Sequence, residues 1–426
     1  MIRGNRKRAV FPATPSQHQE IRLSPLDLPM FFFHYIRKGL LYQTSPENFS
    51  SQVDLLAQKL SQLLVKFYPL AGRFKTSPSD GAVYIDCNDS GVDFIEATAG
   101  DLSIADVTTA EVTQSVEQLF ALNGAVNLDG HRLPLLVVQV TQLKDGISVC
   151  CTVNHAVADG ISFWHFFNSW AHLCRTNGNE IPNNPIHDRC LVNPGGSVIK
   201  LGLDPDGNIP RLCPPPLRIK FFHFSAHTIR CLKDRANRDS PVVISSFQAL
   251  CGHVWRAVTR ARGLGPDEPT TFRLPANCRP RFVPPLPNFY FGNAIQAIWT
   301  TATVRELNSL PLSFAAGLLN AMIVGLRDQV IRERIDMWEK EPTVNRLDKL
   351  EKNSVMMGSS PRFEMYDNDF GWGRPVTVRS GMANYFDGKV SAYPGKEGGG
   401  SVDLEICLLP HFMNALETDL DFISSL

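Results

Sequence analysis

Apolar residues recur at helical spacing in several parts of the chain. Between residues 50 and 68, one helical face behind serine caps is apolar and consists of Val53, Leu56, Leu60, Leu63, Leu64 and Phe67. Pro69 and Gly72 follow, so this amphipathic helix is expected to end there and the chain to turn. Further helices are predicted from Ser225 to about Ala236, from Ser245-Ser246 to Gly263, and from Pro410 onward.

Strand-like runs separate these helices. They are Ala82–Cys87, Val92–Glu96, Ile219–Phe224, Ala294–Thr303, Thr377–Arg379 and Ser401–Leu409. Two longer apolar runs, Leu135–Leu143 and Ile147–Asn154, are joined by Lys144-Asp145-Gly146, and Asp-Gly between β-rich runs is typical of a hairpin. Helical spacing returns from Gly160 to Arg175, so a strand must end and a helix begin within His155–Gly160.

One long stretch, Thr176–Pro216, is rich in Asn, Pro and Gly and shows no sustained period. This composition predicts a crossover linker between two halves. We therefore divide the chain into an N-terminal domain (1–180), a linker (181–218) and a C-terminal domain (219–426). Both halves mix strands and helices, and no internal repeat is evident, so the fold class is expected to be α/β.

Charge and composition narrow the function classes. The 426 residues carry 42 Lys and Arg against 42 Asp and Glu, so the formal net charge is zero. That balance gives no reason to expect nucleic acid or an anionic membrane as a partner. With 43% hydrophobic and 20% charged residues, the composition is that of a globular protein, and the apolar runs fall far short of the ~18 residues that a membrane span needs.

The N-terminus is basic but lacks the apolar segment of a signal peptide. We predict a solvated arm, and a nuclear-import or nucleic-acid role for its basic residues is the less favoured alternative; they are Arg3, Arg6, Lys7 and Arg8. Ten cysteines are scattered along the chain without a Cys-x-x-Cys or a cluster with histidine. This pattern favours buried, reduced thiols in a cytoplasmic protein and gives no metal site.

Catalytic chemistry is indicated at His155-Ala-Val-Ala-Asp159-Gly160, where the second strand of the hairpin gives way to a helix. A His at the end of a buried strand can reach a cavity, the small residues leave room for a substrate, and an imidazole can accept a proton near neutral pH. Asp159 could orient His155 as in a catalytic triad or form an ion pair with an Arg. A core histidine beside a helix-capping Asp is the purely structural alternative.

A second motif, Asp369-Phe-Gly371-Trp372-Gly373-Arg374, lies near the C-terminus. An indole N–H only donates hydrogen bonds, so Trp372 suits an oxyanion or a carboxylate neighbour. The alternative is an aromatic plug in a turn. The chain has no Gly-x-Ser-x-Gly, Walker A, Gly-x-Gly-x-x-Gly or His-Glu-x-x-His motif, which removes the simplest hydrolase, NTPase, dinucleotide and zinc-protease interpretations.

Together the two motifs resemble those of the BAHD acyltransferase family of plants, which transfers acyl groups from CoA thioesters to alcohols or amines. The resemblance extends over most of the chain. It includes Leu23-Ser-Pro-Leu-Asp27, Tyr68-Pro-Leu-Ala-Gly-Arg73, Ser245-Ser-Phe-Gln-Ala-Leu250, Asn277-Cys-Arg-Pro-Arg281, Pro284-Pro-Leu-Pro287, Tyr290-Phe-Gly-Asn293 and Gly358-Ser-Ser-Pro-Arg-Phe363. Arg374, where Lys is frequent, and the residues before Leu23 depart from the family pattern.

The resemblance implies two chloramphenicol-acetyltransferase-like domains, with mixed β-sheets flanked by helices, joined by the crossover loop. A channel between them would admit CoA from one face and the acceptor from the other, to meet at His155. In such proteins the Asp of the first motif pairs with an Arg of the second domain, so Asp159 is expected to be structural, with Arg279 or Arg281 as its partner. The structural and CoA-contacting positions implied by the resemblance are Asp369, Gly371, Gly373, Ser245 and Ser246.

The implied reaction is direct acyl transfer in a ternary complex. His155 is the general base, Trp372 a candidate contact to the oxyanion or acceptor, and acyl-CoA a co-substrate, with no permanently bound cofactor or metal. The expected donor is aromatic, hydroxycinnamoyl or acetyl, the acceptor is a hydroxyl or amine of a plant metabolite, and the protein is a monomer. Two alternatives stay open: a lyase on the same scaffold that acts on an isochorismate conjugate, and a non-catalytic binding protein.

Overall fold

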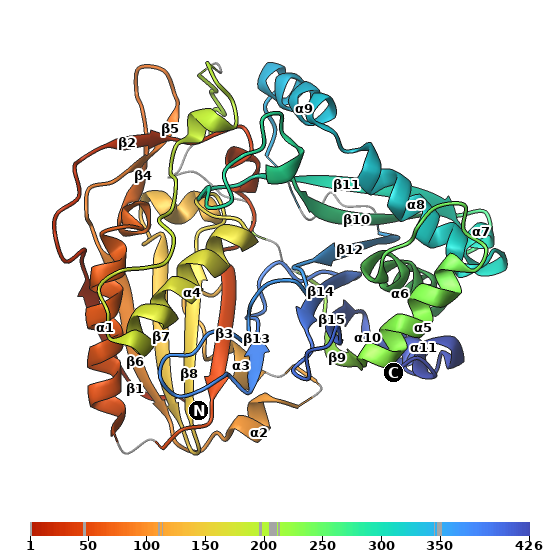
Figure 1. The fold of residues 1–426 in the computed structure, drawn as a ribbon, viewed down its shortest axis with the longest axis horizontal. Coiled ribbons are helices and arrows are strands. Elements are labelled where there is room, and N and C mark those ends of the chain that lie inside the picture. Colours follow the sequence, from red (N-terminus) through yellow and green to blue (C-terminus); the bar gives the residue numbers. More distant parts are fainter. Residues whose placement is uncertain are drawn as a thin grey trace.

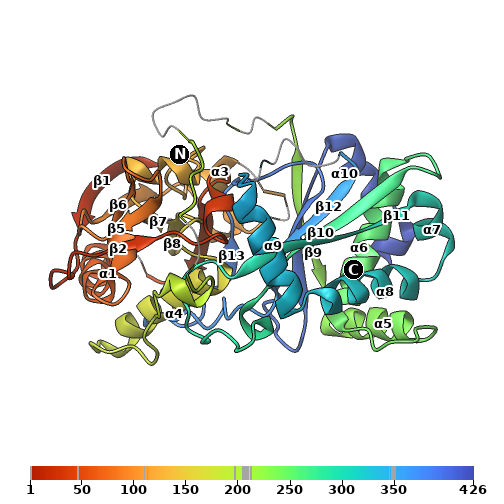
Figure 2. The same ribbon diagram turned by 90° about the horizontal axis from the view of Figure 1, so that it is seen from above.

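The molecule is built from two six-stranded sheets, each covered by helices, that lie side by side (Figure 1). The computed structural model describes residues 2–45, 48–109, 111–112, 114–195, 198–203, 211, 214–344, 346 and 352–426. Viewed from above, the red-to-yellow first half and the green-to-blue second half occupy opposite sides (Figure 2). The expected α/β class with mixed, helix-flanked sheets is therefore confirmed.

The first sheet has the order β1-β6-β7-β8-β3-β13. Its strands are β1 (Arg3–Val10), β6 (Val92–Ala99), β7 (Leu136–Leu143), β8 (Ile147–Val153), β3 (Ile36–Tyr42) and β13 (Thr377–Arg379). Strands β7 and β8 form the predicted hairpin, with Gln142 opposite Ile147. Strand β8 is buried along its whole length, which explains its continuous apolar run.

The N-terminal segment is not a solvated arm, so that prediction was wrong. Strand β1 pairs antiparallel with β6 at the edge of the first sheet. Two of its basic side chains form ion pairs, with Lys7 2.6 Å from Asp93 and Arg8 2.8 Å from Asp54. Charged side chains on an edge strand hinder pairing with other chains, so a basic sequence is compatible with a strand at this position.

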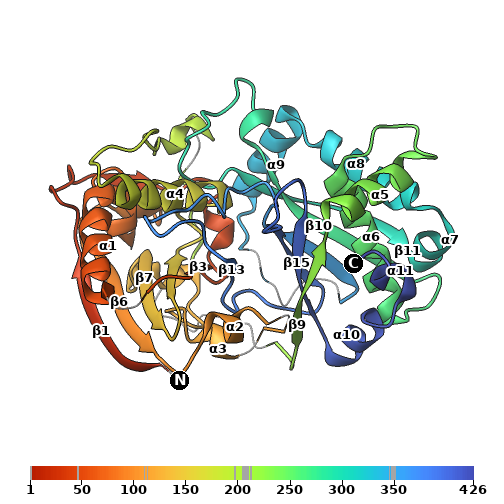
Figure 3. The same ribbon diagram turned by 60° about the horizontal axis from the view of Figure 1, so that its bottom comes forward.

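The division at residue 219 also needs correction, because the second half returns a strand to the first sheet. Strand β13 pairs antiparallel with β3, Thr377 opposite Leu41 and Arg379 opposite Gly39. Figure 3 shows this blue strand beside β3, among the orange and yellow strands. Residues 377–379 thus belong structurally to the N-terminal half.

The second sheet has the order β11-β10-β12-β14-β15-β9. Its strands are β11 (Ile295–Thr303), β10 (Pro269–Asn277), β12 (Ser354–Gly358), β14 (Lys389–Pro394), β15 (Val402–Leu408) and β9 (Arg218–Phe224). A small third sheet, β2-β5-β4, covers one end of the first half and contains β2 (Glu20–Arg22), β5 (Val83–Asp86) and β4 (Arg73–Thr76).

Helices pack against both sheets. They are α1 (Phe49–Leu64), α2 (Ile104–Val107), α3 (Gln114–Glu117), α4 (Gly160–Thr176), α5 (Ala226–Asn237), α6 (Ser246–Arg262), α7 (Val304–Ser309), α8 (Leu312–Gly325), α9 (Asp328–Lys340), α10 (Pro410–Leu416) and α11 (Leu420–Ile423). Helix α6 begins at a capping box formed by Ser245 and Gln248, and ends at Gly263 in the left-handed conformation, as its sequence predicts. No single helix within the described residues is long and apolar enough to cross a membrane; α8 and α9, bent by 75° at their junction, meet the length and composition criteria only together.

The linker between the halves contributes to the core. Its residues 196–197, 204–210 and 212–213 lie outside the described residues. Ile186 forms a bridge with Tyr290 of the second half, and Arg189 is buried between them. The crossover segment is therefore packed into the interface at these positions.

Candidate active site

His155 lies between the end of β8 and the start of α4, on the wall of a cavity of about 860 Å³. Residues of both halves line this cavity, from β3 and α4 on one side and from β10 and β14 on the other. The backbone of His155 is held from two directions: its N–H donates to Asn127 Oδ1 at 2.7 Å, and its carbonyl accepts from Asn293 Nδ2 at 2.7 Å. These contacts fix the position of the imidazole at the cavity.

The His155 ring has one enclosed and one accessible nitrogen. Nδ1 is shielded from solvent and has no hydrogen-bond partner among the described residues, whereas Nε2 is not enclosed in this way. Burial lowers the pKa of His155, and the charge of Lys389 lowers it further, while Asp159 and Asn293 oppose the change. A neutral imidazole with Nε2 open to a cavity can accept a proton from a bound substrate.

The carboxylate of Asp159 is bound by groups other than the His155 ring. Asp159 is fully buried, and its carboxylate accepts hydrogen bonds from Arg279 at 2.6 and 3.0 Å. The backbone N–H groups of Ser162 and Ala294 donate to the same carboxylate, both at 3.0 Å. Burial by itself raises the pKa of Asp159, but Arg279 and these hydrogen bonds hold it below its ordinary value. The carboxylate therefore caps α4 and joins the halves, and it does not orient the His155 ring.

Arg281, the other candidate partner of Asp159, does not reach it. Its guanidinium donates to the carbonyls of Ile323 and Leu326, at 2.8 and 2.7 Å, and so holds the end of α8. Gly160 lines the cavity, but its open side is filled by Phe363, whose ring would lie 2.9 Å from an added Cβ. The missing side chain at Gly160 therefore accommodates Phe363.

A second buried ion pair supports the same loop and was missed by the sequence analysis. Asp27 is fully buried and accepts from Arg189 Nε at 3.1 Å. Its other oxygen accepts from the backbone N–H and side-chain amide of Asn293, at 3.0 and 2.9 Å. Arg189 also donates to the carbonyls of Val157 and Phe291. Asp27 and Asn293 stand in the two family-like motifs Leu23–Asp27 and Tyr290–Asn293, which was the available signal.

The second motif forms a turn beside Tyr42, and its Asp369 lines the same cavity as His155. Asp369 accepts from the N–H groups of Gly371 and Gly373, at 2.8 and 2.9 Å. These glycines have φ angles of 101° and 85°, which other residues rarely adopt. An Asp with two glycines is thus required by the turn itself.

Trp372, which the sequence suggested as an oxyanion contact, lies among aromatic rings. It packs edge-on against Tyr42, with ring centroids 5.4 Å apart. Tyr42 pairs with Ile147 at the far end of β8, six residues and therefore roughly 20 Å from Val153, after which His155 follows. Among the described residues that line the cavity, Trp372 is absent. Its role is to cover the outer end of the first core, as the plug interpretation states.

Ser245 and Ser246 lie at the start of α6, at the edge of the cavity. Ser245 Oγ accepts from Gln248 N at 3.2 Å, and Gln248 Oε1 accepts from Ser245 N at 2.7 Å, so this serine is engaged in capping. The next residue after Ser246, Phe247, lines the cavity. The two serines therefore lie next to a residue that lines the cavity, but they are not among the lining residues themselves.

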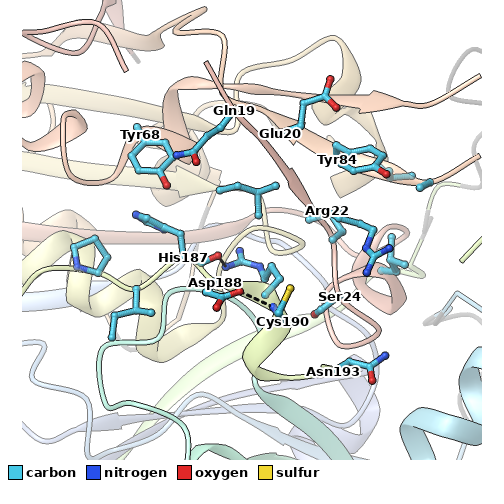
Figure 4. A pocket seen from close by; sticks show the side chains of 18 of the residues that line it. Gln19, Glu20, Arg22, Ser24, Tyr68, Tyr84, His187, Asp188, Cys190 and Asn193 are labelled. Atoms are coloured by element: carbon cyan, nitrogen blue, oxygen red, sulfur yellow. Dashed lines mark hydrogen bonds between the residues drawn. The ribbon is translucent and has the colours of Figure 1, made fainter. Parts of the chain in front are cut away.

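A second cavity of about 950 Å³ lies between the small sheet and the linker. Figure 4 shows Gln19, Glu20 and Tyr68 on one wall and His187, Asp188 and Cys190 on the other. His155 is not among the described residues that line it, and no group of three or more His, Cys, Asp or Glu side chains suited to a metal occurs in the described part of the chain.

Comparison with known proteins shows similarity over nearly the whole chain. The sequence profile described as "Transferase family" matches residues 1–423. The chain is 39% identical to the BAHD acyltransferase DCR of Arabidopsis thaliana, over 96% of this chain and 89% of that protein. It is 31% identical to hydroxycinnamoyltransferase 1 of Oryza sativa subsp. japonica, over 96% of each. The structure of F. graminearum TRI101 complexed with coenzyme A and T-2 mycotoxin has a similar fold, with a TM-score of 0.79 at 19% identity, covering 95% of this chain and 98% of that one.

Proposed function

The chain belongs to the BAHD family of acyltransferases, and we propose that it transfers an acyl group from a CoA thioester directly to a hydroxyl or amine of a small plant metabolite. Its class, acyl transfer other than aminoacyl transfer, follows from the family. The observation that carries the proposal is a neutral His155 whose Nε2 opens into a cavity between two halves, while Asp159 is engaged elsewhere.

His155 acts as the general base in this reaction. Nε2 takes the proton from the acceptor O–H or N–H, and the oxygen or nitrogen adds to the thioester carbonyl. The tetrahedral intermediate then collapses by breaking the C–S bond, and the imidazolium returns the proton to the departing CoA thiolate. Protons and electrons balance within the ternary complex, and no metal or permanently bound cofactor takes part.

Direct attack is favoured over an acyl-enzyme by the surroundings of His155. A covalent mechanism needs a Ser or Cys hydrogen-bonded to the base. No hydrogen bond joins the His155 ring to a Ser or Cys side chain among the described residues. The hydroxyl of Ser162, near the start of α4, instead accepts a hydrogen bond from Arg279 Nη2 at 3.1 Å and donates one to the carbonyl of Gly292 at 3.0 Å.

The acyl donor is proposed to be aromatic, hydroxycinnamoyl or acetyl. Phe163, Trp164 and Phe363 line the cavity and offer apolar faces to an aromatic acyl chain. Hydroxycinnamoyl transfer is the activity that the name of the rice relative states. We further propose a cytoplasmic monomer; the nine described cysteines are unpaired, seven of them buried, which supports a reducing compartment.

The decisive experiment replaces the base. Purified wild type and His155→Ala are incubated with a panel of acyl-CoAs and plant alcohols and amines, and products are read by mass spectrometry. His155→Ala should lower transfer by about 10²- to 10⁴-fold while leaving the melting temperature and CoA affinity unchanged. The matched control is His227→Ala, at an exposed position on α5, which should retain full activity.

Retention of most activity by His155→Ala would refute the assignment of the base. A product formed by wild type without any CoA thioester, from an isochorismate conjugate, would instead establish the lyase alternative. Absence of acyl-CoA binding by calorimetry would favour a non-catalytic binding protein.

A further inference from the structure

A cluster of polar side chains lies in the wall of the His155 cavity, and the acyl-transfer steps make no use of it. Lys38 comes from β3, Ser380 follows β13, and Lys389 is the first residue of β14; all three line the cavity. Behind them, Tyr393 of β14 and Glu405 of β15 are each only 1% exposed. Both halves of the molecule thus contribute to one polar cluster.

Lys38 is tied into this cluster by hydrogen bonds. Its Nζ donates to Ser380 Oγ at 2.5 Å and to Tyr393 OH at 3.1 Å, and it lies 4.5 Å from the Tyr393 ring centroid. Glu405 Oε1 in turn accepts from Tyr385 OH at 2.8 Å and from Tyr393 OH at 3.3 Å. The Lys38 ammonium is therefore fixed on the cavity wall and linked to Glu405 through a tyrosine.

Lys389 differs from Lys38, because its ammonium forms no hydrogen bond or ion pair with any residue that the structure describes. Its Nζ passes over Gly358, where an added Cβ would lie only 2.4 Å away, so the glycine keeps room for the charged group. Burial lowers the pKa of both lysines to about 8, with Glu405 opposing the change. A pKa near 8 leaves both ammonium groups mostly charged at neutral pH.

The cluster holds more positive than negative charge. Lys38 and Lys389 face a single carboxylate, Glu405, whose Oε2 is buried without a partner among the described residues. Burial raises the pKa of Glu405, while Lys38 and the tyrosine hydroxyls lower it. A buried charge lacking a partner is costly, so this wall is suited to an anion that arrives with a substrate.

Three other carboxylates line the cavity, those of Glu364, Asp367 and Asp369, and none of them forms an ion pair with Lys389 in the described part of the chain. Asp367 is paired with Arg374, and Asp369 accepts from two backbone amides of its own turn. Lys389 nevertheless lies near enough to His155 for its charge to lower the pKa of the imidazole. One small molecule in the cavity can therefore reach both the base and the free ammonium.

We propose that Lys389, with Lys38 beside it, binds a carboxylate of the acyl acceptor, so that the enzyme selects acidic alcohols or amines over neutral ones. This inference rests on the acyl-transfer function proposed above and adds a substrate class to it. An ammonium–carboxylate contact is a charge-assisted hydrogen bond, stronger than one between neutral groups and more so away from water.

Calorimetry with a matched pair of probes tests the site without knowledge of the natural acceptor. The probes are 3-hydroxybenzoate and its methyl ester, which differ in charge but share the ring and hydroxyl. Wild type should bind the acid about 10- to 100-fold more tightly than the ester, the range expected for a hydrogen bond to a charged group. Lys389→Met should lose this preference while still binding the ester, and Lys389→Arg should keep it.

The matched control is Lys233→Met, which removes an exposed lysine of α5 and should leave the preference intact. Because Lys389→Met removes an unpaired charge, it should fold, and an unchanged melting temperature verifies this. Equal binding of acid and ester by wild type, or an intact preference in Lys389→Met, overturns the proposal.

The anion could instead belong to the donor, and the same variant distinguishes the sources. Titrations with CoA, acetyl-CoA and malonyl-CoA should give the same affinities for wild type and Lys389→Met. A loss of affinity for all three would assign Lys389 to the CoA phosphates, and a loss confined to malonyl-CoA would assign it to an acyl carboxylate. Either result overturns the acceptor assignment.

Failure of this inference is separable from failure of the acyl-transfer proposal. His155-dependent release of CoA with equal use of acidic and neutral acceptors refutes only the carboxylate site. A Lys389-dependent preference for the acid without CoA release by any acceptor refutes only acyl transfer.

Discussion

The two motif aspartates, Asp159 and Asp369, differ in burial and in the groups that they bind. Asp159 is fully buried and joins the halves through Arg279, beside the base His155. Asp369 sits in a turn near the surface and accepts two amide hydrogen bonds from its own glycines. Neither carboxylate touches the imidazole. A family motif can therefore mark an inter-domain pair or a tight turn, and among these motif residues His155 is the one that we propose for proton transfer.

Replacement of Asp159 is expected to have the largest effect on stability. Asp159→Ala leaves the Arg279 guanidinium buried without its carboxylate and should destabilise the protein by about 3–5 kcal/mol. Urea denaturation measures this loss. Asp54→Ala, which removes the exposed partner of Arg8, is the control and should cost no more than about 1 kcal/mol. An Asp159→Ala variant as stable as wild type but inactive would give Asp159 a catalytic role.

Replacement of Trp372 is expected to lower stability through lost packing and to leave catalysis unchanged. Trp372→Ala removes a partly buried ring from Tyr42 and Phe370 and should cost about 2 kcal/mol, less than a fully buried Trp. The kcat of the folded variant should equal that of wild type. Trp299→Ala, at a half-exposed position on β11, is the matched control and should cost less. A large fall in kcat for Trp372→Ala at unchanged stability would support the alternative hypothesis that Trp372 contacts the reacting atoms.

Asp369→Asn should have a smaller effect. The amide oxygen of Asn can still accept from Gly371 and Gly373, so about 1 kcal/mol of stability is expected to be lost. Thermal unfolding measures the difference from Asp367→Asn, a nearby exposed carboxylate that pairs with Arg374. Loss of the fold in Asp369→Asn would show that the charge itself supports the turn.

The smallest expected effect concerns pH, and it sharpens the comparison between the two carboxylates. The pKa of His155 is lowered by burial, so the acid limb of kcat/KM should lie below pH 6.5, with activity lost as the imidazole becomes protonated. Asp159 raises this pKa, hence Asp159→Asn should move the acid limb to lower pH. Asp369→Asn should leave it in place. A shift of the acid limb in Asp369→Asn would contradict this difference between the two carboxylates.

Local patterns in the sequence predicted the elements whose signals are short-range. The hairpin β7–β8 follows from Asp145-Gly146 between apolar runs, and α6 from its serine cap and Gly263. His155 was identified because a strand and a helix meet there. These features depend on neighbours within a few residues, so the local sequence is sufficient to predict them.

Long-range partners could not be predicted in the same way. The pairing of β13 with β3 joins residues more than 330 positions apart. The local sequence of Thr377–Arg379 does not indicate which sheet this strand joins. The Asp27–Arg189 pair likewise depends on the linker folding back into the interface. Trp372 is a related case: an indole donor suits an oxyanion chemically, but its location is set by Tyr42.

The return of β13 to the first sheet affects the order in which the protein can be completed during synthesis. Strand β3 leaves the ribosome early, yet the partner for its outer edge follows only at residues 377–379, after most of the second sheet has been made. Until then the edge of β3 presents unpaired backbone groups that another chain could take up. The nascent first half therefore has to be kept apart from its copies until about the last eighth of the chain emerges.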